Sequence, residues 1–315
     1  MNSDKSVVVT AAPGSIANLG ALFDLAALAI KEKKDIIKVR LIEEKGIHVI
    51  STDPSIPSGR KNIAYFVAKE FFERIGIQEV GLEITVHKGV DVGVGLGSSG
   101  ATAVAVALAL NVLFNTKMRS EELIEIAGKG EGAIAGSPHY DNVSASMLGG
   151  LVIILRRRPL KIVKLKFPND IIVVHIMPKI EVKGAKTKFF RSVLPRTITL
   201  EEHVEEVANA IKFVKAIYEN NLEELGEATC NGGVVEKERS KYIPNYWKIK
   251  DIALKCGALG YNISGAGPSM FALVRENEKE EFLERFYSRL SKLEGEYHVE
   301  ILHPNNEGAQ VLEVY

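Results

Sequence analysis

The apolar positions in the first part of the chain follow strand and helix periods in turn. Residues 6–12 are rich in valine and end at Pro13-Gly14, which predicts a strand, a turn and then a short segment over residues 15–24. Apolar residues at helical spacing over 62–76 predict a helix that ends at Gly76, a residue type favoured after a helix C-terminus. Further strands are expected at residues 25–30, 35–44, 46–52 and 80–90.

A glycine- and serine-rich turn at residues 93–100 then leads into a small-residue apolar segment, which predicts a helix over 101–113. Ser120 is expected to cap the next helix, because Glu121 and Glu122 would fall in its first turn. Residues 137–150 are polar and glycine-rich and are expected to form a loop before a strand at 151–155.

The second half alternates differently, with one apolar run, long amphipathic segments and glycine turns. It predicts a strand at residues 171–178, helices at 201–219, 246–260 and 278–293, a strand, a tight glycine turn and a second strand over 260–274, and a last strand at 297–304. Strands covered by helices on one side of a mixed sheet indicate α+β sandwich domains. The polar, proline-bearing stretch 156–170 indicates a boundary between domains at 1–162 and 163–315.

Composition narrows the class of partner. The chain has 315 residues, which favours two domains, and its 40 basic and 40 acidic residues give a net charge of zero. This balance argues against nucleic acid or an anionic membrane as the main partner and favours a small molecule. Two cysteines without CxxC spacing indicate neither a disulfide framework nor a zinc site. The absence of a long apolar run predicts a soluble, cytoplasmic protein.

The glycine-rich turn is the main candidate for an anion site, since the first N–H groups of a helix lack partners within the helix. Gly95 to Gly100 satisfies GxGxxG, but the dinucleotide motif needs an acidic residue on a second strand about 20 positions later. Glu121 and Glu122 lie at that distance in a predicted helix. A Walker loop is excluded because the next lysine is Lys117. Close packing of the helix would be the purely structural explanation.

Several ordered motifs resemble the small-molecule kinases named for galactose, homoserine, mevalonate and phosphomevalonate, the GHMP kinases. They resemble the homoserine kinase branch in particular. The motifs are APGSIANLGALFD (12–24), DVGVGLGSSGATA (91–103), HxDNVxxxxLGG (139–150), TKxxRxVLP (187–195), RxxYIP (239–244) and ISGAGPSMFAL (263–273). The resemblance implies a two-domain GHMP kinase fold, with an N-terminal domain like domain 2 of ribosomal protein S5 and a C-terminal ferredoxin-like α/β sandwich.

The same resemblance implies an activity. Such an enzyme would use ATP and Mg²⁺ to phosphorylate the side-chain hydroxyl of L-homoserine, giving O-phospho-L-homoserine for threonine biosynthesis. It also implies a possible homodimer.

Each motif carries implied site residues. Asn62 would lie on the adenine side of the nucleotide, and Glu131 with Ser98 or Ser99 would hold the magnesium ion. The nucleotide-binding loop would comprise Asp91, Val92, Gly93, Val94, Gly95, Leu96, Gly97, Ser98, Ser99, Gly100 and Ala101.

For the amino-acid substrate, Arg191 and Arg239 would bind the carboxylate, since a guanidinium forms bidentate contacts with it. Thr187 would lie near the transferred phosphate. The other implied substrate contacts are Asn18, Asp24, His139, Ser264, Gly265 and Gly267.

The proton acceptor is left open between two residues. In the mevalonate branch an aspartate lies seven residues before a Gly-Gly pair, whereas here Asn142 has that spacing and Asp141 precedes it. An amide is a poor proton acceptor. Our hypothesis is that Asn142 orients the hydroxyl and catalysis rests on positioning and charge stabilisation, with Asp141 as a general base being the alternative.

The chain also departs from the family pattern. Ala21-Leu22 replace Pro-Gly, Asp91 replaces a proline, Gly100 replaces an alanine, and residues 236–239 replace Glu-Pro-Tyr-Arg. Three rival functions therefore stay open: a kinase of the same superfamily for another alcohol such as mevalonate, a nicotinamide-dependent oxidoreductase, and a non-catalytic nucleotide-binding module.

Overall fold

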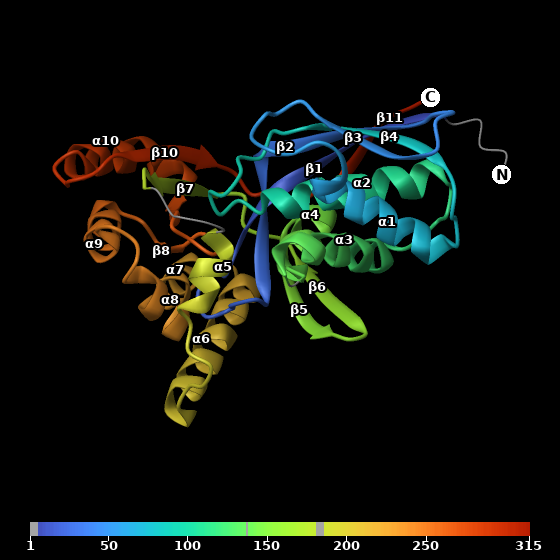
Figure 1. The fold of residues 1–315 in the computed structure, drawn as a ribbon. Coiled ribbons are helices and arrows are strands. Elements are labelled where there is room, and N and C mark those ends of the chain that lie inside the picture. Colours follow the sequence, from blue (N-terminus) through green and yellow to red (C-terminus); the bar gives the residue numbers. More distant parts are fainter. Residues whose placement is uncertain (1–5, 137, 181–185) are drawn as a thin grey trace.

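The structure, a computed structural model, describes residues 6–136, 138–180 and 186–315 (Figure 1). In this part of the chain, seven strands form one sheet and four strands form a second. The first sheet contains β1 (Val7–Ala17), β2 (Ala26–Leu41), β3 (Gly46–Ser51), β4 (Gly81–His87), β5 (Leu151–Arg157), β6 (Leu160–Leu165) and β11 (Gln310–Val314).

The strand β2 organises the first sheet, which runs in the order β11-β1-β2-β4-β3. Its first residues pair with β5, which pairs with β6, and its second half pairs with β4. The two strands expected at 25–30 and 35–44 are therefore one 16-residue strand, because the polar residues between them stay in a continuous β structure. The turn expected at Pro13-Gly14 is instead a register shift within β1, which continues to Ala17.

Four helices in the described part of the chain pack against the first sheet, and among them the small apolar residues of α2 (Ser98–Leu113) are buried. The four helices are α1 (Ile63–Ile75), α2, α3 (Ser120–Ala135) and α4 (Tyr140–Leu148), preceded by a short 3₁₀ turn η1 (Gly59–Lys61). The core joins Val104 and Leu110 of α2 to Phe71 of α1 and to Ile84 of β4. α2 is apolar around most of its circumference, as expected for a fully buried helix.

Two predictions about these helices are wrong. Ser120 is the first residue of α3, while Arg119 precedes the helix and donates its N–H to the Glu122 carboxylate at 3.1 Å. Within the expected loop 137–150, residues 140–148 form α4; residue 137 lies outside the described residues. The polar sequence of α4 suggested an exposed loop, but its polar residues can be buried in a helix. The hydroxyl of buried Ser146, for example, donates to the Pro13 carbonyl at 2.7 Å.

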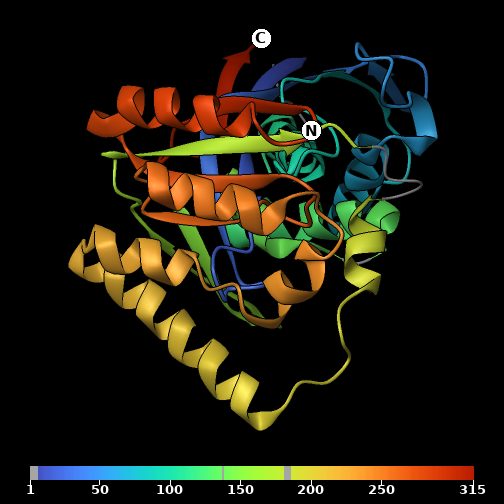
Figure 2. The same cartoon turned by 90° about the vertical axis from the view of Figure 1, so that its left-hand side faces the viewer.

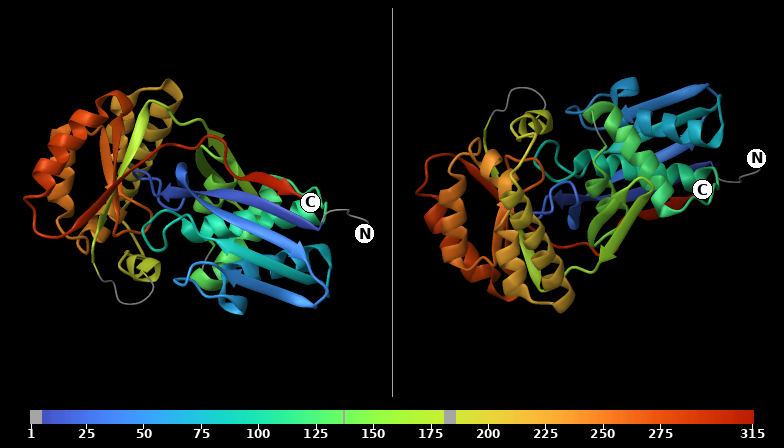
Figure 3. Two further views of the ribbon diagram at one scale, coloured as in Figure 1. Left: turned by 90° about the horizontal axis from the view of Figure 1, so that it is seen from above. Right: turned by 90° about the horizontal axis from the view of Figure 1, so that it is seen from below.

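The second sheet has the antiparallel order β10-β7-β9-β8, formed by β7 (Ile171–Pro178), β8 (Gly260–Ile263), β9 (Met270–Arg275) and β10 (Tyr297–Leu302). The helices in this half are α5 (Lys186–Ser192), α6 (Leu200–Glu219), α7 (Leu222–Thr229), α8 (Gly233–Ser240), α9 (Tyr246–Cys256) and α10 (Lys279–Leu290), with a 3₁₀ turn η2 (Glu276–Glu278). Ile172 and Val174 of β7 pack with α9 and α10, whereas Ile171 and Val173 pack with α6, α7 and the first sheet. Figures 2 and 3 show these helices on both sides of the sheet.

The chain does not end in the second sheet. After β10, the expected last strand, β11 returns to pair antiparallel with β1, so Val8 faces Val314. The expected boundary at residues 162 and 163 falls inside β6, which pairs with β5 in the first sheet. By strand pairing, the first unit therefore contains two separate parts of the sequence. Within the described ranges, no helix is both long enough and apolar enough to cross a lipid bilayer.

Candidate active site

Three segments far apart in the sequence meet where the two sheets join: the end of β1, the glycine-rich loop before α2, and the turn between β8 and β9. The Ser15 N–H donates to the Leu96 carbonyl at 2.9 Å, which ties β1 to the loop. The Gly265 N–H donates to the Ala17 carbonyl at 3.1 Å, and the Asn18 amide donates to the Gly265 carbonyl at 2.7 Å. The two glycine motifs of the sequence thus form one site.

The glycines of the loop are required by close approach. A Cβ atom on Gly95 would lie 2.4 Å from the Ser264 carbonyl oxygen, and the Ser264 hydroxyl donates to the Gly95 carbonyl at 2.9 Å. A Cβ on Gly97 would lie 2.5 Å from the Ser15 hydroxyl and 2.7 Å from the Asn142 amide oxygen. Gly97 also has a φ of 60°, the left-handed conformation that favours glycine. Any larger residue would separate the three segments.

α2 begins immediately after Gly97, so its first backbone N–H groups lie at the junction. The serines that begin this helix have different environments. The Ser98 hydroxyl donates to the Val90 carbonyl at 2.9 Å, whereas the Ser99 hydroxyl donates to the Glu131 carboxylate at 2.5 Å. Of the two predicted metal-ligand serines, Ser99 is the one that the fold places beside Glu131.

Glu131, in α3, is buried, and its carboxylate contacts both Ser99 at the start of α2 and His139. Its carboxylate accepts the His139 N–H at 3.1 Å and lies 3.3 Å from His139 Nδ1. Burial alone would lower the pKa of His139, but the hydrogen bond to Glu131 and its negative charge outweigh burial and raise that pKa.

A buried carboxylate beside a hydroxyl fits Mg²⁺, which prefers oxygen ligands and keeps several waters. In the described residues, no group of three or more His, Cys, Asp or Glu side chains could hold a metal ion. A nucleotide would have to supply further oxygen ligands.

The sequence analysis missed a buried charge cluster beneath the loop. The Lys88 ammonium, at the end of β4, forms an ion pair with Asp35 of β2, and these side chains are only 5% and 0% exposed. Lys88 also donates to the Ser98 carbonyl at 3.2 Å and to the Thr102 hydroxyl at 3.1 Å. Burial lowers the pKa of Lys88 despite the neighbouring carboxylate. A lysine inside the apolar stretch that leads into a glycine loop was the signal that could have revealed it.

The two predicted carboxylate-binding arginines lie together. Their guanidinium carbons are 5.4 Å (Arg191) and 5.1 Å (Arg239) from the ring centre of Phe23, a residue that the sequence analysis did not single out. Arg191, from α5, also pairs with Asp24, because its Nη2 donates to both carboxylate oxygens, at 2.8 and 3.0 Å. One aromatic ring thus supports two like charges, a favourable cation–π arrangement.

Arg239, from α8, is buried to 2% exposure and is held by backbone carbonyls. It donates to the carbonyls of Phe190 and Gly265, each at 3.1 Å. Burial, and then the positive charge of Arg191, lower the pKa of Arg239 to about 10, so it stays charged at neutral pH. Among the described residues this buried cation donates to carbonyls and to no carboxylate, so it is suited to an anionic ligand.

Asp141 and Asn142 lie in the first turn of α4 and have separate roles in the local network. Burial, with a smaller effect from the charge of Asp24, raises the pKa of Asp141 to about 6. The Asn142 N–H donates to the Asp141 carboxylate at 2.8 Å, and the Asn142 side-chain oxygen accepts from the Ser15 hydroxyl at 2.8 Å. Asn142 is therefore fixed beside the loop.

The remaining predicted residues are less closely gathered. Asn62 caps α1: its side chain accepts from the Ala64 N–H at 2.9 Å and donates to the Pro57 carbonyl at 2.7 Å. Asp91 forms an ion pair with Lys33 at 2.7 Å and is exposed. Thr187 is exposed on the first turn of α5. The neighbouring Lys186 donates to the Gly93 carbonyl at 3.4 Å, so α5 does contact the loop.

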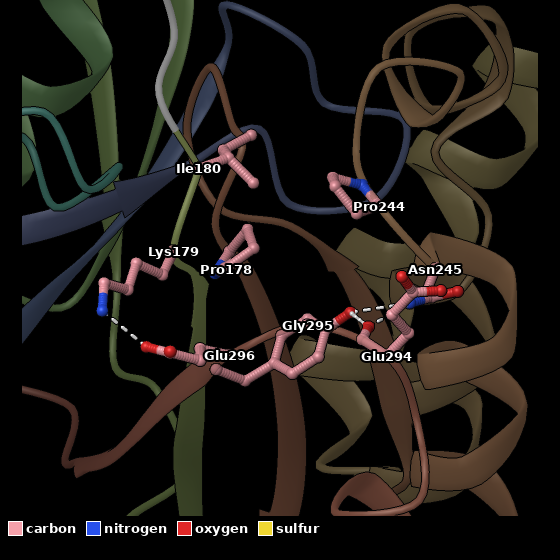
Figure 4. A pocket seen from close by; sticks show the side chains of 9 residues that line it. Pro178, Lys179, Ile180, Pro244, Asn245, Glu294, Gly295 and Glu296 are labelled. Carbon is pink, nitrogen blue, oxygen red and sulfur yellow. Dashed lines mark hydrogen bonds and ion pairs between the residues drawn. The ribbon is translucent and has the colours of Figure 1, made fainter.

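A pocket of about 390 Å³ opens elsewhere, at the end of β7 (Figure 4). Lys179 and Glu296, which both line it, form an ion pair at 2.6 Å, and Asn245 donates to the Glu294 carbonyl at 2.8 Å. None of the predicted site residues lines this pocket.

Known proteins resemble this chain in sequence and in fold. Family models describe residues 62–150 as the N-terminal domain and residues 213–292 as the C-terminal domain of GHMP kinases. The homoserine kinase of Methanococcus vannielii is 34% identical over 85% of this chain and 88% of its own length. The homoserine kinase of Arabidopsis thaliana is 34% identical over 86% of this chain and 75% of its own length.

A solved structure extends the comparison to the whole fold. The crystal structure of homoserine kinase from Cytophaga hutchinsonii superposes with a TM-score of 0.88 at 32% identity and covers 99% of both chains. The expected two-domain GHMP kinase fold and kinase class are thus confirmed. The chain belongs to the homoserine kinase family of the GHMP kinases.

Proposed function

We propose that this chain transfers the γ-phosphoryl group of ATP to the side-chain hydroxyl of L-homoserine, giving O-phospho-L-homoserine for threonine biosynthesis. The observation that carries the proposal is the pair Arg191 and Arg239 on the ring of Phe23, joined through Gly265 to the segments around the start of α2. A carboxylate site thus lies beside an anion-binding helix start, as an amino-acid kinase requires.

In this proposal the arginines bind the substrate carboxylate. Asp24 accepts a hydrogen bond from the substrate ammonium. Asn18 would lie beside this contact, because its side-chain oxygen accepts the Asp24 N–H at 2.9 Å. The pair between Asp24 and Arg191 would rearrange as substrate enters, with the carboxylate taking over part of the contact to Arg191. His139 would contact the substrate on the same side of the site as Asp24. The turn of Ser264, Gly265 and Gly267 would hold the second half of the site against the first.

The nucleotide phosphates would lie along the loop 91–101, held by backbone N–H groups at the start of α2. Glu131 and Ser99, with Ser98 as the alternative serine, would hold Mg²⁺, which neutralises phosphate charge when bound. Asn62 would shape the adenine side as the N-cap of α1, and Thr187 would lie toward the transferred group.

For proton transfer we propose that Asn142 orients the substrate hydroxyl and that positioning and charge stabilisation supply catalysis. The fixed Asn142 side chain beside Gly97 supports this account. Asp141 as a general base is the second candidate, favoured by its pKa of about 6, which lies close to the working range of a base. We further propose a cytoplasmic protein that acts on a small molecule, binds neither nucleic acid nor membrane, and forms a homodimer.

A coupled assay of ADP release, with ATP and Mg²⁺, tests the function. It should be run with homoserine, mevalonate, serine, threonine and no acceptor. We expect turnover that depends on homoserine. Turnover with mevalonate in its place would contradict homoserine as substrate and the ammonium contact to Asp24, because mevalonate carries a carboxylate but no ammonium group. Turnover with none of the acceptors would favour a nucleotide-binding module. Protection of the fold against heat by NADH but not by ATP would favour the oxidoreductase alternative.

A further inference from the structure

The helix α6 has two apolar faces, and within the described residues one of them is buried in the core while the other is largely exposed. Phe213, Ala216 and Ile217 are buried and form part of the core with α7 and the second sheet. On the opposite side of the helix axis, given 3.6 residues per turn, Leu200, Ile211 and Tyr218 are 79%, 63% and 88% exposed. Figures 1 and 2 show α6 along the lower edge of the molecule.

The exposed side forms a continuous stripe, which we call the α6 stripe: Leu200, Val204, Val207, Ile211, Val214 and Tyr218. Val214 is half-buried and the others are exposed. The steps between successive members alternate between four and three residues, as in the seam of a coiled coil. Large apolar side chains at this spacing, largely open to solvent, are typical of an interaction surface rather than of an ordinary helix face.

The α6 stripe is symmetric about residue 209. Leu200 and Tyr218 lie nine positions on either side, Val204 and Val214 five, and Val207 and Ile211 two. A stripe with this symmetry is self-complementary when two copies of the helix run antiparallel about a two-fold axis. Each member then meets its counterpart: Leu200 opposite the partner's Tyr218, and Val207 opposite the partner's Ile211.

The charges along α6 favour the same arrangement. The first half of the helix carries Glu201 and Glu205, whereas Lys212 and Lys215 lie in the second half, where each also pairs with glutamates of the same chain. Antiparallel pairing sets the acidic half of one helix against the basic half of the other, with Glu201 flanking the partner's Lys215. Parallel pairing would instead bring the acidic halves together.

We infer that the α6 stripe is the interface between two copies of this chain, packed antiparallel about a two-fold axis at the level of residue 209. The inference rests on the homodimer proposed above and names its surface. Since the chain runs from Arg191 in α5 directly to α6, the interface would also anchor the segment that carries this substrate-binding residue.

The test is the mass in solution, measured by light scattering during size-exclusion chromatography over a range of protein concentrations. The wild type is expected at twice the 34.5 kDa chain mass, and the double variant Val207→Glu with Ile211→Glu at the single mass. Tyr287→Glu, an equally drastic change on the exposed side of α10, should leave the dimer intact. Unchanged melting temperatures would show that each variant remains folded.

A charge reversal tests the antiparallel register without altering the apolar stripe. Glu201→Lys should raise the dimer dissociation constant at least about fivefold, because the new side chain would face the partner's Lys215, whereas Glu280→Lys on exposed α10 should leave it unchanged. A wild type that stays at the single mass up to about 100 µM would overturn both the homodimer and this surface. A dimer that survives the Val207→Glu and Ile211→Glu variant would overturn the surface alone. Neither outcome decides whether the chain phosphorylates homoserine, which the ADP-release assay tests separately.

Discussion

Arg191 and Arg239 share the ring of Phe23 but differ in what else holds them. Arg239 is fixed by two carbonyls, whereas Arg191 is half-exposed and paired with Asp24. We predict that Arg239→Lys raises the homoserine KM by about 10- to 100-fold, because lysine cannot form the bidentate carboxylate contact, worth about 1.5–3 kcal/mol. The KM for ATP should be unchanged. Steady-state kinetics check this, with Arg285→Lys on exposed α10 as the matched control.

Equal losses for both substrates would show that Arg239 supports the fold of the site rather than the carboxylate. A KM for homoserine that stays within about twofold would contradict the carboxylate assignment altogether.

Asp141 permits a prediction about stability, because burial raises its pKa from 3.8 to about 6. The folded state holds the proton more tightly than the unfolded chain, so this group favours folding below about pH 4 and loses that contribution as pH rises to about 6. The loss is on the order of 3 kcal/mol. Asp141→Asn should therefore be more stable than the wild type above pH 6, and this advantage should vanish near pH 4. Thermal unfolding of the ligand-free proteins across this range measures it, and a difference independent of pH would contradict it.

The same variant separates the two accounts of proton transfer. If positioning dominates, Asp141→Asn should keep kcat within about tenfold of the wild type, since a general base supplies about 10²- to 10⁴-fold. Loss of turnover with both substrate affinities intact would instead make Asp141 the base. Single-turnover kinetics with titrated binding distinguish the two results.

At the scale of elements, β2, β4 and α2 are joined under the loop by the buried pair of Lys88 and Asp35. Lys88→Met should lower the free energy of unfolding by about 3–5 kcal/mol, because Asp35 would be left charged and buried. Adding Asp35→Asn should recover part of the loss, since the amide oxygen can still accept the N–H groups of Gly89 and Val90. Urea denaturation measures these values.

Lys45→Met provides the matched control, because the ion pair of Lys45 with Glu79 is exposed at both ends. Its removal should cost no more than about 1 kcal/mol. If Lys88→Met cost as little as Lys45→Met, the cluster would not stabilise the start of α2.

The elements also show what the sequence could predict. Glycine and apolar spacing gave α1 with its end at Gly76, and the motifs brought Gly95, Ser264 and Arg239 to one site. Periodicity failed for α4, where polar side chains are buried: its Ser146 is satisfied by a carbonyl 133 residues away. It failed equally for Phe23, because a ring between two arginines is a tertiary contact without a local signal.

At the scale of the whole molecule, the two sheets meet through backbone contacts at the candidate site. Ser264 and Gly265 on one side contact Gly95, Ala17 and Asn18 on the other. The carbonyl of Gly265 accepts from both Asn18 and Arg239. The contact that joins the two units therefore also holds Arg239, the proposed substrate-binding residue, and loosening it should weaken both proposed ligand sites together.

Gly95→Ala tests this coupling. The added Cβ would lie 2.4 Å from the Ser264 carbonyl oxygen, so the turn must move away from the loop. We predict a loss of at least about tenfold in affinity for both ATP and homoserine, measured by calorimetry for each ligand. Gly76→Ala is the control, because Gly76 has a similar φ, +73° against +78°, but open space around its Cβ position. Both variants bear the cost of a left-handed alanine, about 1 kcal/mol, so a difference between them isolates the close approach. A Gly95→Ala protein that lost affinity only for ATP would show that the loop acts on the nucleotide alone, independently of the second sheet.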